Sequence, residues 1–280
     1  MYIITGQTAT GKTNLAYELA KKHKGELINF DSRQIYQKLN IITGKQVFPD
    51  VKTHLIDIVD PKEQFSSFDF ANSAKRIINY LIRHNIMPIL VGGTYLYLKH
   101  LLYGIDTKVP ADWKLREELG KKSVKQLQDI LKKHSVQTFE RLNQSDRNNP
   151  HRLIRKIEIY STHLTFPERK KTNYFPGKYN YKLIGLRFKS NESLKKAVEK
   201  RVEQRVRNGA FQEVKHLIKQ GYKSTDPGMQ TIGYKQLIQY YSGTISRDEA
   251  LQQWITKEVQ YAKRQYTFMK KDKNISWEIV

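Results

Sequence analysis

The sequence predicts an α/β fold: a doubly wound parallel sheet with a helical insertion domain. Short apolar runs alternate with helical patterns over the first hundred residues, and a glycine-rich loop follows the first run. Polar helical patterns without strand signals take over after residue 107. Short β-rich runs separated by helices are typical of a parallel sheet covered on both faces. The downstream loss of strand signals indicates a helical segment inserted into this core.

Strands are expected at residues 2–5, 27–30, 54–59, 88–91 and 181–188, where short apolar runs occur. Core helices are expected at 14–23, 68–85 and 95–102, and again from the last strand to about residue 271. Within the inserted segment, helical patterns cover 111–120, 123–134 and 150–160. We therefore expect a core made of residues 1–107 and 181–280, interrupted by a helical insertion at 108–180.

The charge of the chain is strongly basic and uneven. The 280 residues include 50 Lys+Arg and 27 Asp+Glu, a formal net charge of +23. Residues 1–107 hold 13 basic and 9 acidic residues, so the remaining 173 residues carry +19. Such a surplus attracts phosphate polyanions, which makes nucleic acid the first partner to consider, although a merely basic surface would have the same composition.

The residue types also exclude several classes of protein. The chain has no cysteine, so it has no disulfide framework, no thiolate metal site and no thiol nucleophile. The first residues lack the pattern of a secretory signal. No apolar stretch approaches the ~18 residues that a membrane helix requires. We expect a cytoplasmic protein with no membrane partner.

The first glycine-rich segment fits a phosphate-binding loop. Gly6-Gln7-Thr8-Ala9-Thr10-Gly11-Lys12-Thr13 matches G-x-x-x-x-G-K-[ST] between the first expected strand and the first helix, which is the context that this P-loop motif requires. Its N–H groups can converge on an anion, Lys12 adds a positive charge, and Thr13 can ligate Mg²⁺. The motif binds a diphosphate or triphosphate, and it leaves kinase, hydrolase and pyrophosphate-releasing transferase chemistry open.

Two further segments follow expected strands, where the ligand crevice of an open α/β sheet lies. Asp31 comes directly after the second strand, so it can act as a general base, as a partner of Mg²⁺, or as a helix N-cap. Gly92-Gly93-Thr94 comes after the fourth strand. Thr94 can donate a hydrogen bond to an anionic oxygen or cap the next helix.

Together these segments resemble the tRNA dimethylallyltransferases (tRNA isopentenyltransferases) of bacterial type, and the resemblance covers nearly the whole chain. Besides the P-loop, it is carried by Asp31-Ser32-Arg33-Gln34-Ile35-Tyr36, His54-Leu55-Ile56-Asp57-Ile58, Gly92-Gly93-Thr94-Tyr95-Leu96-Tyr97, Pro150-His151-Arg152-Leu153-Ile154-Arg155 and Ile232-Gly233-Tyr234-Lys235-Gln236. The Asp-Ser-x-Gln-x-Tyr block and the late Gly-Tyr-x-Gln block are more specific than a P-loop alone.

The resemblance implies transfer of a dimethylallyl group from dimethylallyl diphosphate to N6 of the adenine 3′ of the anticodon, position 37, in tRNA. Asp31 would be the general base and Thr94 would lie beside the reacting groups. The diphosphate, with Mg²⁺ at Thr13, would be bound by Gly6, Thr8, Ala9, Thr10, Gly11, Lys12, Thr13 and Arg201. Contacts to the anticodon arm are implied for Asp31, Ser32, Arg33, Gln34, Arg116, His151, Arg152, Leu153, Ile154, Arg155, Ile232, Gly233, Tyr234, Lys235 and Gln236.

The chain departs from the family pattern at two places. The usual Asp-Ile-Gly-Thr-Ala-Lys run is replaced by Asn40-Ile41-Ile42-Thr43-Gly44-Lys45, and a common second arginine four residues before Arg201 is Ala197. Two other functions use the same loop: a small-molecule or nucleoside kinase, and an RNA-stimulated NTPase. We expect a monomer, because the asymmetric tRNA supplies its own large interface.

Overall fold

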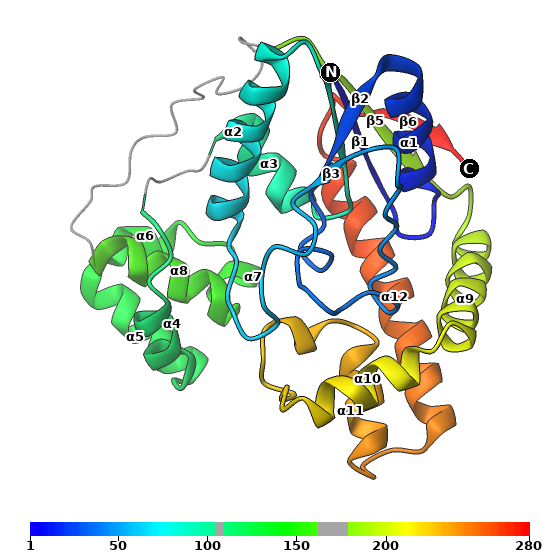
Figure 1. Cartoon of the computed structure of the whole chain (residues 1–280). Coiled ribbons are helices and arrows are strands. Elements are labelled where there is room, and N and C mark those ends of the chain that lie inside the picture. Colours follow the sequence, from blue (N-terminus) through cyan, green and yellow to red (C-terminus); the bar gives the residue numbers. More distant parts are fainter. Residues whose placement is uncertain (105–108, 162–178) are drawn as a thin grey trace. The chain divides into compact units, whose positions relative to one another are not determined.

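The chain forms two compact units. A computed structural model describes residues 1–104, 109–161 and 179–280. The first unit, here called the sheet unit, comprises Met1–Leu102 and Tyr174–Val280, and the second, the insertion unit, comprises Tyr103–Asn173 (Figure 1). The expected insertion at 108–180 is offset from this division by a few residues at each end. The expected boundary at residues 107 and 108 lies outside the described residues.

The sheet unit is built on a parallel sheet with the strand order β3-β2-β4-β1-β5-β6. The central strand β1 pairs with β4 on one side and with β5 on the other, so that Ile3 lies opposite both Leu90 and Leu183. The strands are β1 (Tyr2–Gly6), β2 (Gly25–Asn29), β3 (Thr53–His54), β4 (Met87–Val91), β5 (Lys182–Arg187) and β6 (Ser276–Ile279). The predicted doubly wound parallel sheet is confirmed.

Helices cover both faces of this sheet, because side chains alternate between the faces along each strand. On β1, Ile4 packs with Ala16 and Ala20 of α1. The next residue, Thr5, points to the other face, where its hydroxyl donates to Met269 Sδ of α12 at 3.1 Å. The sequence fits this double cover, since buried apolar residues on both faces give the strands their unbroken apolar runs.

Serine residues start several helices of the sheet unit. Ser66, Ser190 and Ser246 form capping boxes with the residue three positions later, which satisfies N–H groups that a helix start leaves free. The helices are α1 (Lys12–His23), α2 (Ser67–Arg83), α3 (Tyr95–Tyr103), α9 (Asn191–Arg207), α10 (Ala210–Lys219), the 3₁₀ turn η1 (Gly228–Gln230), α11 (Tyr234–Tyr241) and α12 (Arg247–Met269).

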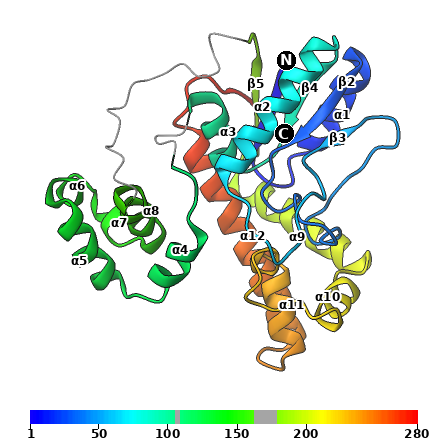
Figure 2. The ribbon, with the colours of Figure 1, turned by 60° about the vertical axis from the view of Figure 1, so that its left-hand side comes forward.

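A second hydrophobic core lies among the helices that follow β5. Trp254 of α12 and Tyr234 of α11 are fully buried there, together with Ile35, Leu39 and Ile42 from the segment after β2. Figure 2 shows α12 as the long helix that extends from α11 to the sheet. This arrangement brings the C-terminal helices against the segment that follows β2.

The insertion unit is helical and has its own core. Leu127, Leu131 and Leu153 are fully buried in it. The unit contains α4 (Trp113–Gly120), α5 (Val124–His134), α6 (Val136–Glu140), α7 (Gln144–Arg147) and α8 (Pro150–Ser161). Among the described residues of the whole chain, none of the helices is both long enough and apolar enough to span a bilayer.

The strand expected at residues 54–59 is wrong beyond His54. The backbone takes left-handed conformations at Leu55 (φ 59°) and Asp57 (φ 55°), which a strand cannot contain. Asn29 Nδ2 donates to the carbonyl of Leu55 at 2.8 Å and fixes this turn. The segment therefore leaves the sheet immediately after a two-residue strand, with Asp57 in an ion pair with Lys45.

Candidate functional site

The P-loop connects β1 to α1 and begins at a glycine that no other residue could replace. Gly6 has φ 134°, and a Cβ atom there would lie only 2.1 Å from the carbonyl oxygen of Leu186 on β5. Gly6 does not line the cavity described below. Its part is to let the loop leave the sheet, so the expected contact between Gly6 and a diphosphate gains no support from the geometry.

The loop presents free N–H groups to one concavity. Ala9 (φ 65°) and Gly11 (φ 78°) are left-handed, a geometry that turns successive N–H groups to the same side. The N–H groups of residues 9–13 form no hydrogen bond to another described residue. Helix α1 also has no side-chain cap, unlike α2, α9 and α12. An unsatisfied helix start of this kind attracts phosphate.

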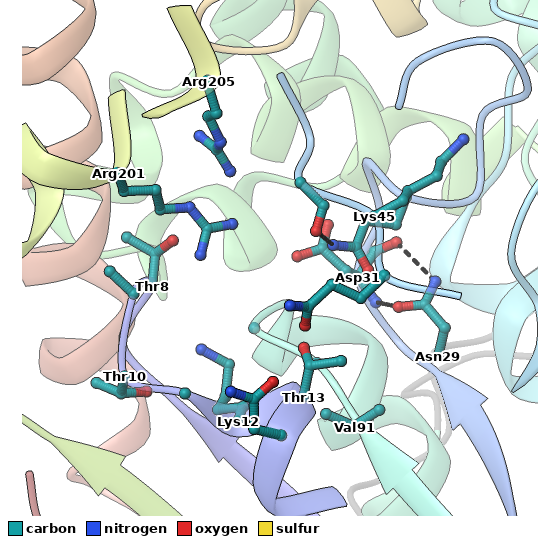
Figure 3. Close-up of a pocket in the computed structure, with 18 of the residues that line it drawn as sticks. Thr8, Thr10, Lys12, Thr13, Asn29, Asp31, Lys45, Val91, Arg201 and Arg205 are labelled. Carbon is teal, nitrogen blue, oxygen red and sulfur yellow. Dashed lines mark hydrogen bonds between the residues drawn. The ribbon is translucent and has the colours of Figure 1, made fainter. Parts of the chain in front are cut away.

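A cavity of about 610 Å³ opens over this loop (Figure 3). Lys12 and Thr13 lie at one side of it, and Arg201 of α9 points into the same space from the opposite side (Figure 3). The other basic residues of the lining are Lys45, Lys200 and Arg205, and Asp31 is the one carboxylate among the lining residues. The lining is therefore strongly cationic, with a single acidic group.

The charges in the cavity perturb one another. Burial and the nearby charge of Arg201 lower the pKa of Lys12 to about 7, against an opposing effect of Asp31. Burial and repulsion from Arg205 lower the pKa of Arg201 to about 10. The Nε atoms of Arg201 and Arg205 are buried without a hydrogen-bond partner among the described residues. Crowded, unsatisfied cations are what an anionic ligand would stabilise.

Asp31 lies at the carboxyl end of β2 and faces the cavity. Its N–H donates to Asn29 Oδ1 at 3.1 Å, and its Oδ1 accepts from the N–H of Arg33 at 2.8 Å. The second of these bonds forms an Asx turn, so the side chain of Asp31 caps a turn instead of a helix. Its second oxygen, Oδ2, accepts no hydrogen bond from a described residue. It is available to a ligand in the cavity.

Thr94 acts on the neighbourhood of Asp31. Its Oγ1 accepts from the N–H of Ser32 at 2.9 Å and lies 3.2 Å from Ser32 Oγ. Thr94 is also hydrogen-bonded to Tyr261, whose pKa is raised to about 12 by burial and by Asp31. Neither Thr94 nor Ser32 lines the cavity, and Arg33 is exposed. Gly92 and Gly93, in contrast, do line it.

Sequence reasoning missed the polar residues of α12, which hold the site together. Gln265 accepts from the N–H of Thr8 and donates to the carbonyl of Gly93, both at 2.9 Å. Glu258 pairs with Arg205. These residues and Tyr261 follow one another at helical spacing on a largely buried helix face. The available signal was that polar residues occupy helix positions where the pattern predicts buried apolar residues. Buried polar groups require hydrogen-bond partners.

Several expected tRNA contacts lie in the insertion unit, and two of the residues belong to the core of this unit. Leu153 is fully buried and Ile154 is 8% exposed, because both side chains form the core of this unit. His151 and Arg152 are exposed at the start of α8, and their contact with tRNA stays a prediction.

Arg116 and Arg155 have an internal partner in the same unit. Both guanidinium groups bond to the fully buried carboxylate of Glu158, with Arg116 bidentate at 2.8 Å for each bond. Arg155 also donates to the carbonyl of Val109 at 2.7 Å. This ion-pair cluster gives both arginines a structural role within the insertion unit.

The late block, residues 232–236, is also mainly structural. Tyr234 is fully buried, Gln236 is 6% exposed, and Gly233 is buried beside Trp254. Gln236 Oε1 accepts from the N–H of Gly233 at 2.8 Å. Burial gives these three residues a structural role, and the tRNA contacts expected for them stay predictions. Ile232 is half-buried against the helical core, and Lys235 alone is exposed.

The remaining predicted residues come together around the cavity. Its lining includes Thr8, Ala9, Thr10, Gly11, Lys12, Thr13, Asp31, Gln34 and Arg201. Ala197 lies one helical turn before Arg201 and also faces the cavity. A second arginine is present, but one turn later, as Arg205. The chain thus lacks an arginine one helical turn before Arg201, at position 197, and has one a turn after it, at position 205.

The residues fit a metal ion only if a ligand supplies most of its oxygens. Among the described residues there is no group of three His, Cys, Asp or Glu side chains that could hold a metal ion. The Thr13 hydroxyl faces the cavity and forms no hydrogen bond to a described residue, and Asp31 is the nearby carboxylate. This donor set suits an Mg²⁺ ion bound mainly by phosphate oxygens.

Known proteins share this fold and sequence. Residues 34–272 match a family model described as IPP transferase, and residues 1–60 match one described as isopentenyl transferase. The tRNA dimethylallyltransferase of Staphylococcus epidermidis is 35% identical, in a match that covers 99% of this chain and 86% of that protein.

Solved structures are also similar to this chain. The full-length tRNA isopentenylpyrophosphate transferase of Bacillus halodurans has a TM-score of 0.72 at 33% identity, covering 99% of this chain and 89% of that one. A eukaryotic dimethylallyltransferase acting on tRNA has a TM-score of 0.80 at 27% identity, covering 96% of this chain and 69% of that one.

Proposed function

Because this chain belongs to the IPP transferase family, we propose that it transfers a dimethylallyl group from dimethylallyl diphosphate to N6 of the adenine at position 37 of tRNA, 3′ of the anticodon. The observation that carries the proposal is the cavity itself. It has a cationic end formed by the P-loop and Arg201, and one carboxylate, Asp31, with a free oxygen. The cationic end suits a departing diphosphate, and the Asp31 carboxylate suits the removal of a proton. The kinase and NTPase alternatives are not favoured by the family matches.

The cationic end of the cavity, where dimethylallyl diphosphate would bind, would stabilise the leaving group. As N6 attacks C1 of the dimethylallyl group, the C1–O bond breaks and its electron pair stays on the diphosphate. The free N–H groups of residues 9–13, Lys12 and Arg201 are oriented before reaction, so they stabilise the new charge without rearranging.

The Asp31 carboxylate, beside which the adenine would bind, would remove the proton of the amine. The lone pair of an adenine amine is delocalised into the ring, so the nitrogen becomes nucleophilic only as it loses a proton. Oδ2 of Asp31 would take this proton while the N–C bond forms. Thr94 holds the backbone of Ser32, and Asn29 holds that of Asp31 itself. Both bonds fix the direction of the carboxylate.

The cavity would also suit a Mg²⁺ ion bound together with the diphosphate. Thr13 would ligate the ion together with diphosphate oxygens, and the bound ion would neutralise charge on the leaving group.

The tRNA would reach the cavity by turning its target base out of the anticodon loop, which costs a few kcal/mol. Contacts between phosphates and basic residues such as Arg152 and Lys235 would offset this cost. Both residues are exposed. We further propose that the enzyme works in the cytoplasm and as a monomer, since one tRNA provides a large asymmetric interface.

Mass spectrometry of tRNA nucleosides tests the proposal. The purified protein is incubated with Mg²⁺, dimethylallyl diphosphate and unmodified tRNA, and the digest is searched for N6-dimethylallyladenosine. A parallel reaction contains radiolabelled ATP in place of the donor. We expect the modified nucleoside in the first reaction and neither label transfer nor RNA-stimulated hydrolysis in the second. Unalkylated tRNA after complete incubation would contradict the proposed activity.

A further inference from the structure

One wall of the cavity is a short irregular segment with two backbone hydrogen bonds of its own, from the N–H of Gly44 to the carbonyl of Ile41 and from the N–H of Lys45 to the carbonyl of Asn40, both at 3.0 Å. These bonds leave the N–H groups of residues 40–42 to be bound from elsewhere. Residues 40–45, here called the rim segment, form turns between the helical core and the cavity. Asn40, Ile41, Gly44 and Lys45 line the cavity. Polar turns of this kind normally fluctuate unless their backbone groups have partners.

The first half of the rim segment is bound to a carboxylate on α10. Glu213 accepts three consecutive N–H groups: Oε2 from Asn40 at 2.8 Å and Ile41 at 2.7 Å, and Oε1 from Ile42 at 3.2 Å. Hydrogen bonds to an ionised acceptor are about twice as strong as neutral ones. A single side chain from α10 therefore fixes three residues of the cavity wall.

A buried phenol fixes Glu213 in turn. The hydroxyl of Tyr234, on α11, donates to Glu213 Oε1. Tyr234 is fully buried, and burial together with Glu213 raises its pKa well above the ordinary value. The phenol thus stays protonated and remains a donor.

The rim segment touches the residues expected to bind the substrates. Gln34 Nε2 donates to the carbonyls of Thr43 and Gly44, both at 3.2 Å. At Gly44, a Cβ atom would lie 2.9 Å from Nη2 of Arg201 and 2.9 Å from Nη2 of Arg205. Both guanidinium groups therefore lie close against the backbone at Gly44, so a shift of the rim segment would change the space that they occupy.

We propose that Glu213 and Tyr234 are positioning residues of the donor site: they hold the rim segment, and through it they hold Arg201 and Gln34 at the cavity. This inference rests on the proposed diphosphate site. It also gives a reason for Tyr234 in the late sequence block, since this residue is fully buried. Neither residue touches the reacting atoms.

Tyr234→Phe is the sharpest test, and α11 offers a matched control. Tyr241 also lies on α11, and its hydroxyl donates to the carbonyl of Phe211 on α10 at 2.9 Å. Tyr241→Phe therefore removes one phenol hydroxyl that bonds to the same helix but leaves the rim segment untouched. Glu213→Gln is the second variant, because it keeps the shape of the side chain and loses its charge.

Binding of inorganic diphosphate is measured by calorimetry for the full-length variants, alongside KM for the donor, kcat and the thermal midpoint. We expect Tyr234→Phe and Glu213→Gln to bind diphosphate about fivefold more weakly and to raise KM accordingly, while Tyr241→Phe binds as the wild type does. Glu213→Asp should not restore binding, since the shorter carboxylate does not reach the rim segment.

Equal diphosphate affinity in Tyr234→Phe and Tyr241→Phe would overturn the inference, as would parallel losses of affinity and thermal midpoint in all three variants. Measurements on the wild-type protein distinguish a failure of this inference from a failure of the proposed function. Wild-type protein that binds diphosphate but leaves tRNA unmodified argues against the proposed reaction only, and the comparison of variants still decides the role of Tyr234.

Discussion

Arg205 and Glu258 form a buried ion pair in which Nη1 lies 2.6 Å from Oε1, with 7% and 9% of the side chains exposed. The pair joins α9 to α12 at the edge of the cavity. Trp254 Nε1 donates to the same carboxylate oxygen at 3.1 Å. Glu258 is the counter-charge that allows Arg201 and Arg205 to stand four residues apart on one buried helix face.

Removing this counter-charge should destabilise the protein strongly. Glu258→Gln leaves the buried guanidinium group of Arg205 without its ion-pair partner, so we expect the free energy of unfolding to fall by about 3–5 kcal/mol. Urea unfolding measures the change. The double variant Arg205→Met with Glu258→Leu removes both charges and should unfold closer to the wild type. A single variant as stable as the wild type would show that the pair contributes nothing.

The lowered pKa of Lys12 predicts a pH-dependent diphosphate site. With a pKa of about 7 in the free protein, Lys12 is charged below pH 7 and mostly neutral at pH 8.5. A bound diphosphate favours the charged form, so binding at pH 8.5 should take up close to one proton and weaken as the pH rises further. Calorimetry in two buffers of different ionisation enthalpy measures this uptake. Lys12→Met should take up about one proton fewer.

Asp31→Asn should separate chemistry from tRNA binding. The amide keeps the size of the side chain and cannot take a proton, so we expect kcat to fall by ~10²–10⁴-fold while tRNA affinity changes little. Single-turnover transfer and a binding titration provide the two measurements. Asp50→Asn, at an exposed pair with Lys21, is the control and should react normally. Near-normal turnover in Asp31→Asn would remove Asp31 from the mechanism.

The insertion unit should unfold in acid because of Glu158. Burial alone would raise the pKa of Glu158, but hydrogen bonds from Arg116, Arg155 and the N–H of Asp112 lower it below the ordinary value of 4.5. The stability contributed by this carboxylate is present above pH 4.5 and is lost as the pH falls through the lowered pKa. Circular dichroism from pH 6 to pH 2 follows this loss. Glu158→Gln should already be destabilised at pH 6 and respond less to acid.

Arg152 should act on tRNA without acting on stability. Its side chain is 58% exposed and pairs with Asp146, so Arg152→Ala should leave the thermal midpoint nearly unchanged. If Arg152 contacts a phosphate, the variant should bind tRNA more weakly and reduce the salt slope of log K by about 1. Binding titrations between 50 and 200 mM salt measure both. An unchanged slope would exclude a phosphate contact at Arg152.

The core of the fold could be predicted because its signals are local. Apolar runs identify β1, β2, β4 and β5, and the glycines of the P-loop identify the first crossover. Strand β6 has no such signal: it is a short edge strand whose residues are mostly exposed, after the polar run 270–274. It exists because β5 offers a free edge. The end of β3 depends on a hydrogen bond from Asn29, which no local pattern indicates.

The site divides in the same way. The P-loop residues and Asp31 could be predicted because short motifs hold them at strand ends. Arg205, Glu213 and Gln265 could not, since each acts on a segment far away in the sequence: Gln265, for example, bonds to Thr8 and Gly93. Leu153 and Tyr234 lie in motif blocks, but their complete burial could not be predicted from those blocks. A sequence motif identifies residues that the family shares, but it does not indicate whether their side chains face a ligand or the hydrophobic core.

The position of β1 between β4 and β5 has a consequence for synthesis on the ribosome. When the first hundred residues have emerged, β4 is available to pair with β1 and β5 is not, so the other edge of β1 has no partner until residues 182–187 follow. During that interval an unpaired edge is exposed to other nascent chains. Helices α9 and α12, which carry Arg201 and Gln265, emerge later still. A prematurely terminated chain would therefore contain a complete phosphate loop and no working enzyme.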